Sequence, residues 1–437
     1  MVEKHAQRLS PNGFETVDLL QALGRTLGEE IVADRDFPPF PRAARDGYAV
    51  RSEDVAKIPC ELEVVGELKA GDSPDDFHVG RAQAVAIMTG APLPKGADAI
   101  VMVEHTLALT EPIPHAQPAS KALIEISRSV ARGENFVPRA AEARAGEVLL
   151  SRGYRLNYAA MAIAASAGKS RVQVYKRPRI AILSTGDELV GIDSLPGPEQ
   201  IRNSNSYSLA AQVLKAGGEP VQLAVAPDEP LRLRSLIEEG LTADLLLLTG
   251  GVSMGKYDLV EKVLTDLQAE FYFTGAKIQP GKPIVFGSVP YGETQHGVTQ
   301  GGAGTPAGLP AQSSASANAT GSASARKYFF GLPGNPVSTM VTFELFAKPV
   351  LEALSGATPI PLIFPSARLK SAIRTKTGLK RFLPGVLTGE FEHAEVELAR
   401  WQGSGDISAV ARANCYIVIP PDLERIEAGE YVSLLMS

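Results

Sequence analysis

The stretch DLLLLTGGVSMGKYD at residues 244–258 contains most of a phosphate-binding loop. Three residues match the spacing of G-x-x-x-x-G-K-[ST], in which backbone amides hold nucleotide phosphates: Gly250, Gly255 and Lys256. Tyr257 stands where that loop needs a hydroxyl to ligate magnesium. Amides at a junction between a strand and a helix can hold an anion without that hydroxyl. The stretch therefore predicts an anion site, in which Asp258 is either a magnesium ligand or the N-cap of the next helix.

Two more turns rich in glycine could line the same site. STGDEL at residues 184–189 carries the adjacent carboxylates Asp187 and Glu188, which suit either a solvated turn or a metal and acid–base role. GLPGNPVS at residues 331–338 is explained by helix initiation with Asn335 as the cap. Its rigid turn could also direct amides at a phosphate, so both interpretations stay open.

The N-terminal third contains two weaker signals. Asp46 precedes Gly47 in a proline-bounded loop, which a tight turn explains without any function. Thr89 follows an apolar run in MTGAPLP and could donate its hydroxyl. Further along the chain, Lys282 stands between Gly and Pro in QPGKP, a rigid setting for one positive charge. The sequence shows no serine–histidine–aspartate arrangement and no histidine-rich metal spacing.

Alternating strands and helices are expected to position the loops between residues 179 and 267. The runs RIAILS, EPVQLAVAPDE and ADLLLLTGG predict strands, and NSNSYSLAAQVLKAGG, PLRLRSLIEEGL and DLVEKVLTDL predict helices. This alternation predicts right-handed crossovers and a parallel, doubly wound sheet. Ligands bind beyond the carboxyl ends of the strands in such sheets. We therefore expect the breaks at 185–186, 249–251 and 331–335 to share one rim.

The flanking regions carry signals of β-structure. Short alternating runs predict a β-rich lobe over residues 51–150 and a small β-barrel or meander over the last part of the chain. Residues 291–326 are almost wholly small and polar, and such a composition cannot bury enough apolar surface to offset the entropy of ordering. We interpret this segment as a disordered loop inserted between two strands, which the slow growth of loop-closure entropy allows.

Composition excludes several classes of protein. A chain of 437 residues is expected to form about two to four domains. A net charge of −6 argues against a general nucleic-acid binder. Cys60 and Cys415 form no zinc or redox spacing, so we expect two inert thiols. Because the N-terminus carries no apolar leader and no run of about 18 apolar residues occurs, we expect no membrane partner and a cytoplasmic location.

Eight motifs taken together give a more specific signal. They occur in the order PPFPRAARDGYAV, IMTGAPLPKGADAIVMVE, STGDEL, IRNSNSYSL, TGGVSMGKYD, QPGKP, GLPGNPVS and QGSGDIS…ANCYIVIP. From about residue 8 to the C-terminus, interrupted only by the small polar segment, the chain closely resembles the molybdopterin molybdenumtransferases, the family of MoeA and the gephyrin E domain.

The resemblance implies an enzyme of molybdenum cofactor biosynthesis. Members insert molybdate into adenylyl-molybdopterin and release AMP, with Mg²⁺ as the metal, and act as homodimers with the site in a cleft between subunits. The implied fold is multidomain α/β, with a central doubly wound α/β molybdopterin-binding domain, a β-rich N-terminal lobe, a linker domain and a C-terminal β-barrel. We place the N-terminal and linker domain at 1–50 with 147–175, the β-rich lobe at 51–146, the α/β domain at 176–357 and the barrel at 358–437. Molybdopterin adenylyltransferase and molybdoenzyme apoproteins are the expected protein partners.

Site residues follow from the matched motifs. The implied catalytic residues are Asp46, Thr89, Glu188, Asp228, Asp258 and Lys282, of which Glu188 and Asp258 are the implied magnesium ligands. The implied substrate-binding residues are Thr185, Gly186, Asn203, Ser204, Thr249, Gly250, Gly251, Ser253, Gly255, Pro333, Gly334, Asn335, Pro336, Arg381 and Ser404. Carboxylates suit a magnesium ion on a phosphoanhydride, whereas hydroxyls, lysine and arginine suit the molybdate oxyanion.

Several positions depart from the family pattern, and they leave open how well Asp46 is supported and how much activity remains. The departures are Pro41, Arg42 and Ala43 in place of Asp, Asn and Ser, Gln279 in place of Lys, Val137 in place of Arg and Glu142 in place of Asp.

Other functions also stay open at this stage. A molybdopterin adenylyltransferase shares the TGG and LPGNP loops, but it resembles the α/β domain alone. A non-catalytic scaffold of the gephyrin kind would keep the fold, although the retained carboxylates favour catalysis. An ATPase is suggested only by the near match at 250–256, and it fails at Tyr257. The preference for molybdate or tungstate and the acceptor enzymes are not readable from the sequence.

Overall fold

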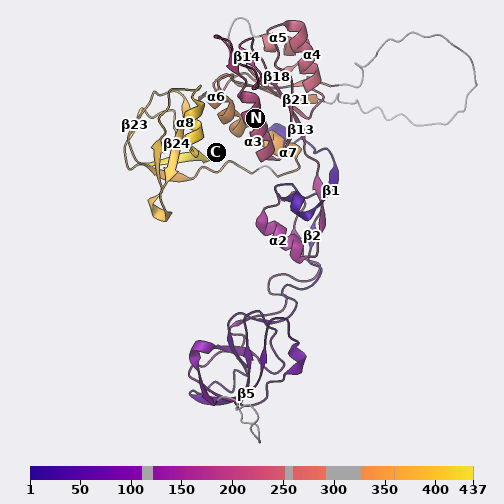
Figure 1. Cartoon of the computed structure of the whole chain (residues 1–437), viewed down its shortest axis with the longest axis vertical. Helices are drawn as coiled ribbons and strands as arrows, with labels where there is room; N and C mark the ends of the chain where they lie inside the picture. Colours follow the sequence, from indigo (N-terminus) through magenta and orange to yellow (C-terminus); the bar gives the residue numbers. More distant parts are fainter. Residues whose placement is uncertain (111–121, 251–258, 292–325, 359, 437) are drawn as a thin grey trace, which may run out of the picture. The chain divides into compact units, whose positions relative to one another are not determined.

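The computed structural model describes residues 1–110, 122–250, 259–291, 326–358 and 360–436 (Figure 1). The chain forms two compact units. The larger unit comprises Met1–Glu15, Gly24–Thr26 and Gln173–Ser437, and the smaller unit comprises Thr16–Leu23 and Leu27–Val172. The division into four domains stays a prediction. Apart from its two end residues, the small polar segment 291–326 lies outside the described residues.

A six-stranded sheet forms the centre of the larger unit, with the strand order β16-β13-β17-β21-β20-β18. Its strands are β13 (Arg179–Ser184), β16 (Glu219–Gln222), β17 (Leu245–Thr249), β18 (Glu270–Phe273), β20 (Val285–Pro290) and β21 (Arg326–Leu332). The strands β16, β13, β17 and β21 run parallel, which confirms the predicted arrangement for these four. The sheet is not parallel throughout, because β20 and β18 at one edge are antiparallel to their neighbours.

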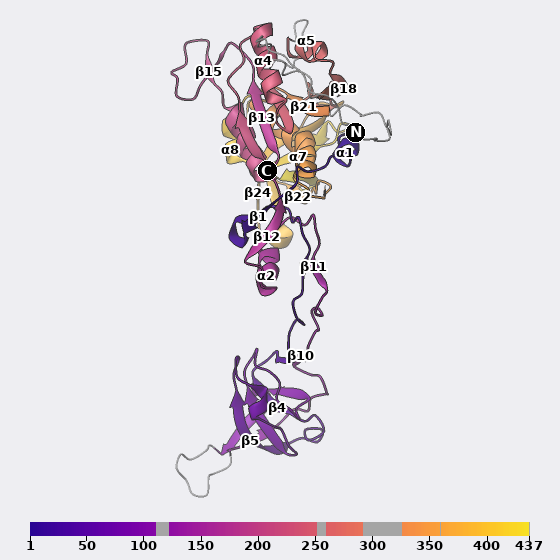
Figure 2. The same ribbon diagram turned by 90° about the vertical axis from the view of Figure 1, so that its right-hand side faces the viewer.

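Helices cover both faces of this sheet, as a doubly wound fold requires. They are α3 (Asn205–Ala216), α4 (Pro230–Gly240), α5 (Leu259–Asp266) and α7 (Lys348–Leu354). Leu209 of α3 and Val350 of α7 pack in one core with Ile182. Leu236 of α4 and Val263 of α5 pack in a second core on the other face. Figure 2 shows α4 beside β13. The doubly wound part of the prediction is therefore confirmed.

Local sequence signals account for several helix ends. Gly217 ends α3 in the left-handed conformation with φ of 96°, which the Gly-Gly stop predicts. Pro336 opens α6 (Pro336–Thr342) at a first-turn position where no amide donor is needed. Asn335 occupies the capping position before it, but its side chain makes no capping hydrogen bond, so this prediction holds for the position only.

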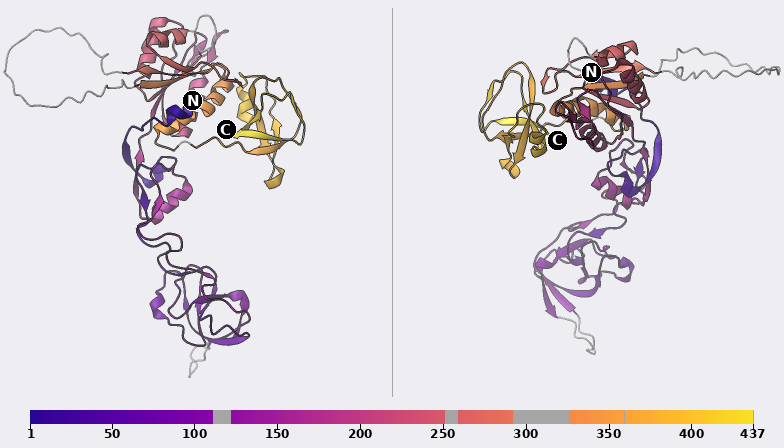
Figure 3. Two further views of the ribbon diagram at one scale, coloured as in Figure 1. Left: turned by 180° about the vertical axis from the view of Figure 1, so that it is seen from behind. Right: turned by 45° about the horizontal axis from the view of Figure 1, so that its top comes forward.

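A closed barrel forms the C-terminal part of the larger unit (Figure 3). Its five strands are β22 (Ser366–Leu369), β24 (Lys380–Thr388), β25 (Glu395–Leu398), β26 (Cys415–Ile419) and β28 (Tyr431–Met436). Pairing of β24 with β26 closes the order β24-β25-β22-β28-β26, which decides between the barrel and the meander. A sixth strand, β19 (Ile278–Gln279), belongs to the α/β part of the chain and pairs with β24 in parallel.

The smaller unit contains a six-stranded sheet with the order β7-β4-β6-β5-β9-β8, which confirms the β-rich lobe. Its strands are β4 (Gly47–Val50), β5 (Cys60–Leu68), β6 (Gln83–Ile87), β7 (Ala99–Met102), β8 (Thr106–Thr110) and β9 (Ala122–Ile126). Val50 and Val101 lie in the core on one side of the sheet, and Ala49 and Ile100 lie in a second core. Alternation along β4 therefore assigns successive side chains to opposite faces.

Shorter elements complete the described chain. The remaining α-helices are α1 (Val2–Ala6), α2 (Tyr158–Ser166) and α8 (Ile407–Arg412). A π-helical turn lies at Phe343–Ala347, and 3-10 helices lie at Leu19–Ala22, Pro74–Asp76, Val103–His105 and Phe391–His393. The remaining short strands are β1 (Phe14–Asp18), β2 (Ile31–Val32), β3 (Arg42–Ala43), β10 (Phe136–Val137), β11 (Val148–Leu150), β12 (Arg171–Tyr175), β14 (Leu189–Val190), β15 (Ile201–Arg202), β23 (Ile373–Arg374) and β27 (Arg425–Ile426). Cys60 and Cys415 are free thiols, and burial raises the pKa of Cys415 to about 11, in keeping with an inert thiol. None of the described helices is long and apolar enough to cross a membrane.

Candidate functional site

The loops that follow neighbouring parallel strands are bonded to one another. The Thr185 amide donates to the Thr249 carbonyl at 2.9 Å, which joins the loop after β13 to the end of β17. The Gly186 amide donates to the Ala226 carbonyl at 3.2 Å and so joins the loop after β16. The predicted rim at the carboxyl ends of the strands is therefore present, and its loops have fixed relative positions.

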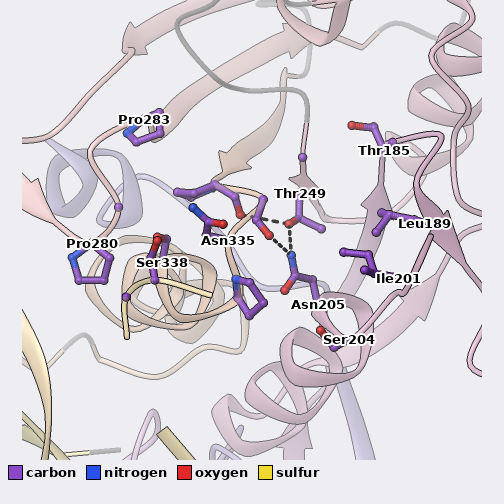
Figure 4. A pocket seen from close by; sticks show the side chains of 18 of the residues that line it. Thr185, Leu189, Ile201, Ser204, Asn205, Thr249, Pro280, Pro283, Asn335 and Ser338 are labelled. Carbon is purple, nitrogen blue, oxygen red and sulfur yellow. Dashed lines mark hydrogen bonds between the residues drawn. The ribbon is translucent and has the colours of Figure 1, made fainter. Parts of the chain in front are cut away.

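Asn205, the first residue of α3, ties two of these loops together (Figure 4). Its side-chain amide donates to the Thr249 hydroxyl at 3.0 Å and to the Gly334 carbonyl at 2.6 Å. The Thr249 hydroxyl in turn donates to the Pro333 carbonyl at 3.2 Å. Both side-chain N–H groups of Asn205 are thereby used as donors. Its remaining polar atom, Oδ1, can only accept a hydrogen bond.

Two buried oxygen atoms of this rim have no hydrogen-bond partner among the described residues. They are Oγ1 of Thr185 and Oδ1 of Asn205. Thr185 is 3% exposed, so water does not solvate its hydroxyl freely. A buried polar atom without a partner costs about 1–3 kcal/mol, and native structures rarely keep one without a bound water or ligand. Both residues also line the pocket described next, so the rim presents polar atoms toward a ligand.

A pocket of about 840 Å³ opens at this rim. Fourteen predicted site residues of the α/β domain and barrel line it: Thr185, Gly186, Glu188, Asn203, Ser204, Asp228, Thr249, Gly250, Lys282, Pro333, Gly334, Asn335, Pro336 and Ser404. The barrel contributes Leu379, Trp401, Gly403 and Ser404. The Val337 amide of α6 donates to the Ser404 carbonyl at 3.0 Å, which fixes the barrel loop against the start of that helix. These fourteen predicted residues of the larger unit thus meet in one place.

Close packing explains a glycine in this rim. Gly250 has φ of +89°, a conformation that side chains rarely adopt. A Cβ atom there would lie 2.4 Å from the Thr185 carbonyl oxygen. Gly334 approaches Gly250 as well, since its own Cβ would lie 3.5 Å from the Gly250 Cα. These glycines allow the loops after β13, β17 and β21 to touch.

The pocket wall carries negative charge at two carboxylates, Glu188 and Asp228. Desolvation raises the pKa of Asp228, and the neighbouring carboxylates of Asp187 and Glu188 raise it further. The Asp228 amide donates to Oδ1 of Asp187 at 3.1 Å, which holds the two acidic loops together. Neighbouring negative charges favour the binding of a cation or a proton.

These carboxylates fit the donor set of magnesium. Mg²⁺ is usually held by one or two carboxylates together with water and substrate phosphates, rather than by a complete cage of side chains. Within the described ranges no group of three or more His, Cys, Asp or Glu side chains forms a metal cage. Glu188 and Asp228 nevertheless supply two carboxylates on the wall of a pocket that also contains anion-binding loops. Asp258, the other predicted ligand, lies outside the described residues, as do Gly251, Ser253 and Gly255.

Arg381 does not line the pocket directly. Its guanidinium donates to the Lys376 carbonyl at 3.0 and 3.2 Å and to the side chain of Gln279, which does line the pocket. Gln279, one of the departures from the family pattern, therefore accepts a hydrogen bond from a cation. Lys282 lines the pocket itself, as predicted.

Asp46 and Thr89 lie in the smaller unit and contact each other. The Thr89 amide and hydroxyl donate to Oδ1 of Asp46 at 2.6 and 2.8 Å, and these hydrogen bonds lower the pKa of Asp46. Asp46 therefore has support despite the altered residues before it. Two of those departures pair with each other, since Arg42 and Glu142 form an exposed ion pair at 2.6 Å.

Comparisons with known proteins cover nearly all of the chain. Three family models match: the MoeA N-terminal region (domain I and II) at residues 1–168, a probable molybdopterin binding domain at 181–353 and the MoeA C-terminal region (domain IV) at 366–436. A molybdopterin molybdenumtransferase from Nostoc sp. is 34% identical over 442 residues, which cover 98% of this chain and 89% of that protein. The chain belongs to the molybdopterin molybdenumtransferase family.

Further relatives agree with this assignment. A molybdopterin molybdenumtransferase from Bacillus subtilis is 31% identical over 430 residues, covering 97% of this chain and 89% of that protein. The crystal structure of the molybdopterin biosynthesis MoeA protein from Pyrococcus horikoshii OT3 is 28% identical, with a TM-score of 0.70, and the match covers 100% of this chain and 99% of that one. The fold of the molybdopterin molybdenumtransferase family is therefore the fold of this chain.

Within this molybdopterin molybdenumtransferase-family fold, some residues of the pocket escaped the sequence prediction. The sequence identifies Asn205 only as part of a helix start. Its hydrogen-bond partners lie 44 and 129 positions away, so the neighbouring residues do not reveal these contacts. Trp401 stood directly before the recognised QGSGDIS motif and attracted no interpretation. Asn203, which was predicted to bind substrate, lines the pocket. Its buried side chain forms hydrogen bonds with Ser184 and Ser206 and so supports the pocket wall.

Proposed function

We propose that this chain inserts molybdate into adenylyl-molybdopterin and releases AMP and the molybdenum cofactor. The observation that carries the proposal is the pocket, which combines glycine-rich loops, two carboxylates, a lysine and hydroxyls in one cavity. The phosphoanhydride, its magnesium ion and the molybdate of this reaction need different partners, and the pocket contains a group for each of them.

The residues of the pocket divide the work by charge. The loops around Thr185, Thr249 and Gly334 are assigned to the phosphates, and Lys282 neutralises part of their negative charge. Ser404 offers a hydroxyl to the molybdate oxygens from the barrel side, and Arg381 adds positive charge at the same edge through its contact with Gln279. Asp46 and Thr89 are proposed as further catalytic residues, as the family resemblance implies.

Magnesium would be held by Glu188 and Asp228, together with Asp258 as the resemblance implies. When bound, it neutralises charge on the phosphoanhydride and so favours cleavage toward AMP. The raised pKa of Asp228 supports this assignment, because a cation beside it would relieve the repulsion among the three carboxylates.

Assembly and location follow from the same resemblance. We propose a cytoplasmic homodimer, with molybdopterin adenylyltransferase as the supplier of the substrate and molybdoenzyme apoproteins as acceptors of the product. Sedimentation equilibrium over a range of concentrations tests the dimer, and a single monomeric species throughout would contradict it.

The alternatives are weaker. An adenylyltransferase function is not favoured, because the MoeA N-terminal and C-terminal regions match on both sides of the molybdopterin-binding domain. A purely structural scaffold is not favoured either, because Glu188, Asp228 and Lys282 still line one pocket.

The test is the release of AMP from adenylyl-molybdopterin by the purified protein with molybdate and Mg²⁺. We expect AMP that depends on molybdate, and a large loss of rate when Mg²⁺ is replaced by EDTA. Reactions without molybdate and without protein are the controls. AMP release that does not depend on molybdate would contradict the proposed reaction.

A further inference from the structure

The pocket has two walls of different chemistry. The α/β wall carries the carboxylates and most of the anion-binding loops, whereas the opposite wall is formed by the barrel and is partly apolar. Leu379, Trp401, Gly403 and Ser404 form the barrel side, next to the pairing of Ile278 with Lys380. The α/β side also has apolar residues, Leu189 and Ile201, but both carboxylates of the lining are on it. The barrel side has no carboxylate among the described lining residues, so it is suited to an uncharged part of a ligand.

Trp401 is the only tryptophan in the chain. It lies between β25 and α8, in a segment without regular structure, and it is half-buried. Its side chain packs against the core of the barrel, which supports the indole from one side. Because the same residue lines the pocket, part of its surface remains open to a ligand.

Aromatic surface is scarce in this pocket. Among the described residues that line it, Trp401 is the only aromatic side chain, and glycine, proline and small polar residues dominate. An indole presents a large, rigid π-face on which a nucleobase-like ring can stack. Phosphates and molybdate are anions and gain nothing from this electron-rich face, so its presence points to a planar ring.

We propose that Trp401 binds the ligand by stacking on a planar, amino-substituted nitrogen heterocycle. This inference rests on the proposed function, whose substrate contains two such rings, the pterin and the adenine. The shared chemistry is the flat, electron-poor ring, and the experiment separates the two sources. Trp401 is a binding residue in this assignment, and it takes no part in bond making.

The fluorescence of the unmodified protein provides a direct reading, because every tryptophan photon comes from one position. We expect saturable quenching when the protein is titrated with a ring that stacks on the indole. 6-Hydroxymethylpterin and AMP are the two probes, and ribose 5-phosphate is the control without a ring. Quenching by the pterin assigns the pterin end, quenching by AMP assigns the adenine end, and quenching by neither overturns the proposal.

A displaced reporter controls for quenching in solution. The double variant Trp401→Phe with Tyr158→Trp places the single tryptophan on α2, at a position that is 87% exposed. The same probes should then quench no more than they quench free tryptophan amide. Equal saturable quenching in this variant would overturn the assignment to Trp401.

Substitution separates stacking from a merely structural role. Trp401→Leu keeps apolar volume against the barrel but removes the π-face, and we expect KM for adenylyl-molybdopterin to rise roughly five- to thirty-fold with kcat within about two-fold. Trp401→Phe should stay within about three-fold of the unmodified KM. An unchanged KM in Trp401→Leu, with AMP release intact, sinks this inference and leaves the proposed function standing. Absence of AMP release from the unmodified protein sinks the proposed function, while the fluorescence titrations still decide the role of Trp401.

Discussion

The side-chain amide of Asn205 lies 3.0 Å from the hydroxyl of Thr249, and the same amide reaches the Gly334 carbonyl at 2.6 Å. One side chain at the start of α3 therefore holds the loops after β17 and β21 at a fixed distance. Because both loops line the pocket, their spacing sets the width of the cavity between them.

Asn205→Ala should loosen this arrangement. Two hydrogen bonds disappear and the Gly334 carbonyl is left without its partner, so we expect a loss of about 1–3 kcal/mol in stability. We also expect kcat/KM for AMP release to fall by roughly ten- to a hundred-fold. Asn157→Ala is the matched control, since it removes a capping hydrogen bond at α2 and lies outside the pocket lining. A similar fall of kcat/KM in both variants would contradict a specific role for Asn205.

Gly250→Ala should destabilise the protein through two causes at once. The residue has a positive φ of +89°, and its new Cβ would lie 2.4 Å from a backbone oxygen. Gly378→Ala is a close control, because its φ is +98° but no atom lies within 4 Å of the new Cβ. We expect about 1 kcal/mol for Gly378→Ala from backbone strain alone and clearly more for Gly250→Ala. Thermal melting of both variants measures the difference, and equal melting temperatures would argue against tight packing at Gly250.

Burial of the Asp228 carboxyl, together with repulsion from Asp187 and Glu188, predicts that the stability of the protein depends on pH. Folding raises the pKa of this carboxyl, so the unfolded chain loses the proton more easily, and ionisation costs folding free energy as pH rises through the usual range of aspartate. Asp228→Asn removes this cost. We expect the variant to melt at a higher temperature than the unmodified protein at neutral pH, with the difference shrinking as the pH falls toward about 4 and absent well below it, where the carboxyl is protonated in both states.

Magnesium should reverse the order of the two melting temperatures. Binding of the ion to Glu188 and Asp228 would stabilise the unmodified protein by RT ln(1 + [Mg²⁺]/Kd), whereas Asp228→Asn would gain less. Melting temperatures with and without Mg²⁺ measure this. An equal gain in both proteins would place the ion elsewhere.

The contact between Thr89 and Asp46 predicts a shift in the pH dependence of activity. Hydrogen bonds from Thr89 lower the pKa of Asp46, so the ionised carboxyl persists to a lower pH than usual, and the stability it contributes is lost as pH falls through this lowered pKa. Thr89→Val removes the hydroxyl and keeps the backbone bond. We expect the acid limb of kcat/KM to move to higher pH, and Thr89→Ser to restore it. If the acid limb of kcat/KM does not move in Thr89→Val, the ionisation of Asp46 does not control the reaction.

Much of the fold could be predicted from local patterns. The apolar runs ending at Ser184 and Thr249 identify buried parallel strands, and the Gly-Gly stop places the end of α3 at Gly217. The break expected from Gly331 begins two residues later, because Gly331 and Leu332 still pair with β17. The antiparallel direction of β20 and β18 was not predicted, since strand direction depends on pairing partners and not on the composition of a strand.

The pocket was predictable as a group of loops but less so as a set of contacts. Glu188, Asp228, Lys282 and Ser404 were assigned through motif matching and lie in one cavity. Arg381 was assigned in the same way, yet its guanidinium contacts Gln279, a residue expected only to have lost a charge. Neither the sequence spacing nor the residue types contain this contact, because it forms between strands β19 and β24.

The short pairing of β19 with β24 has a consequence for how the enzyme can change. Ile278 pairs with Lys380 and Gln279 with Arg381, and Lys282 follows only three residues later. A shift of this pairing by one residue would turn each side chain of β19 to the opposite face. The barrel thus sets the register of the segment that carries Lys282 to the pocket. Insertions or deletions in β24 would displace the positive charge of Lys282 in the pocket. The barrel and the α/β domain are therefore constrained to evolve together.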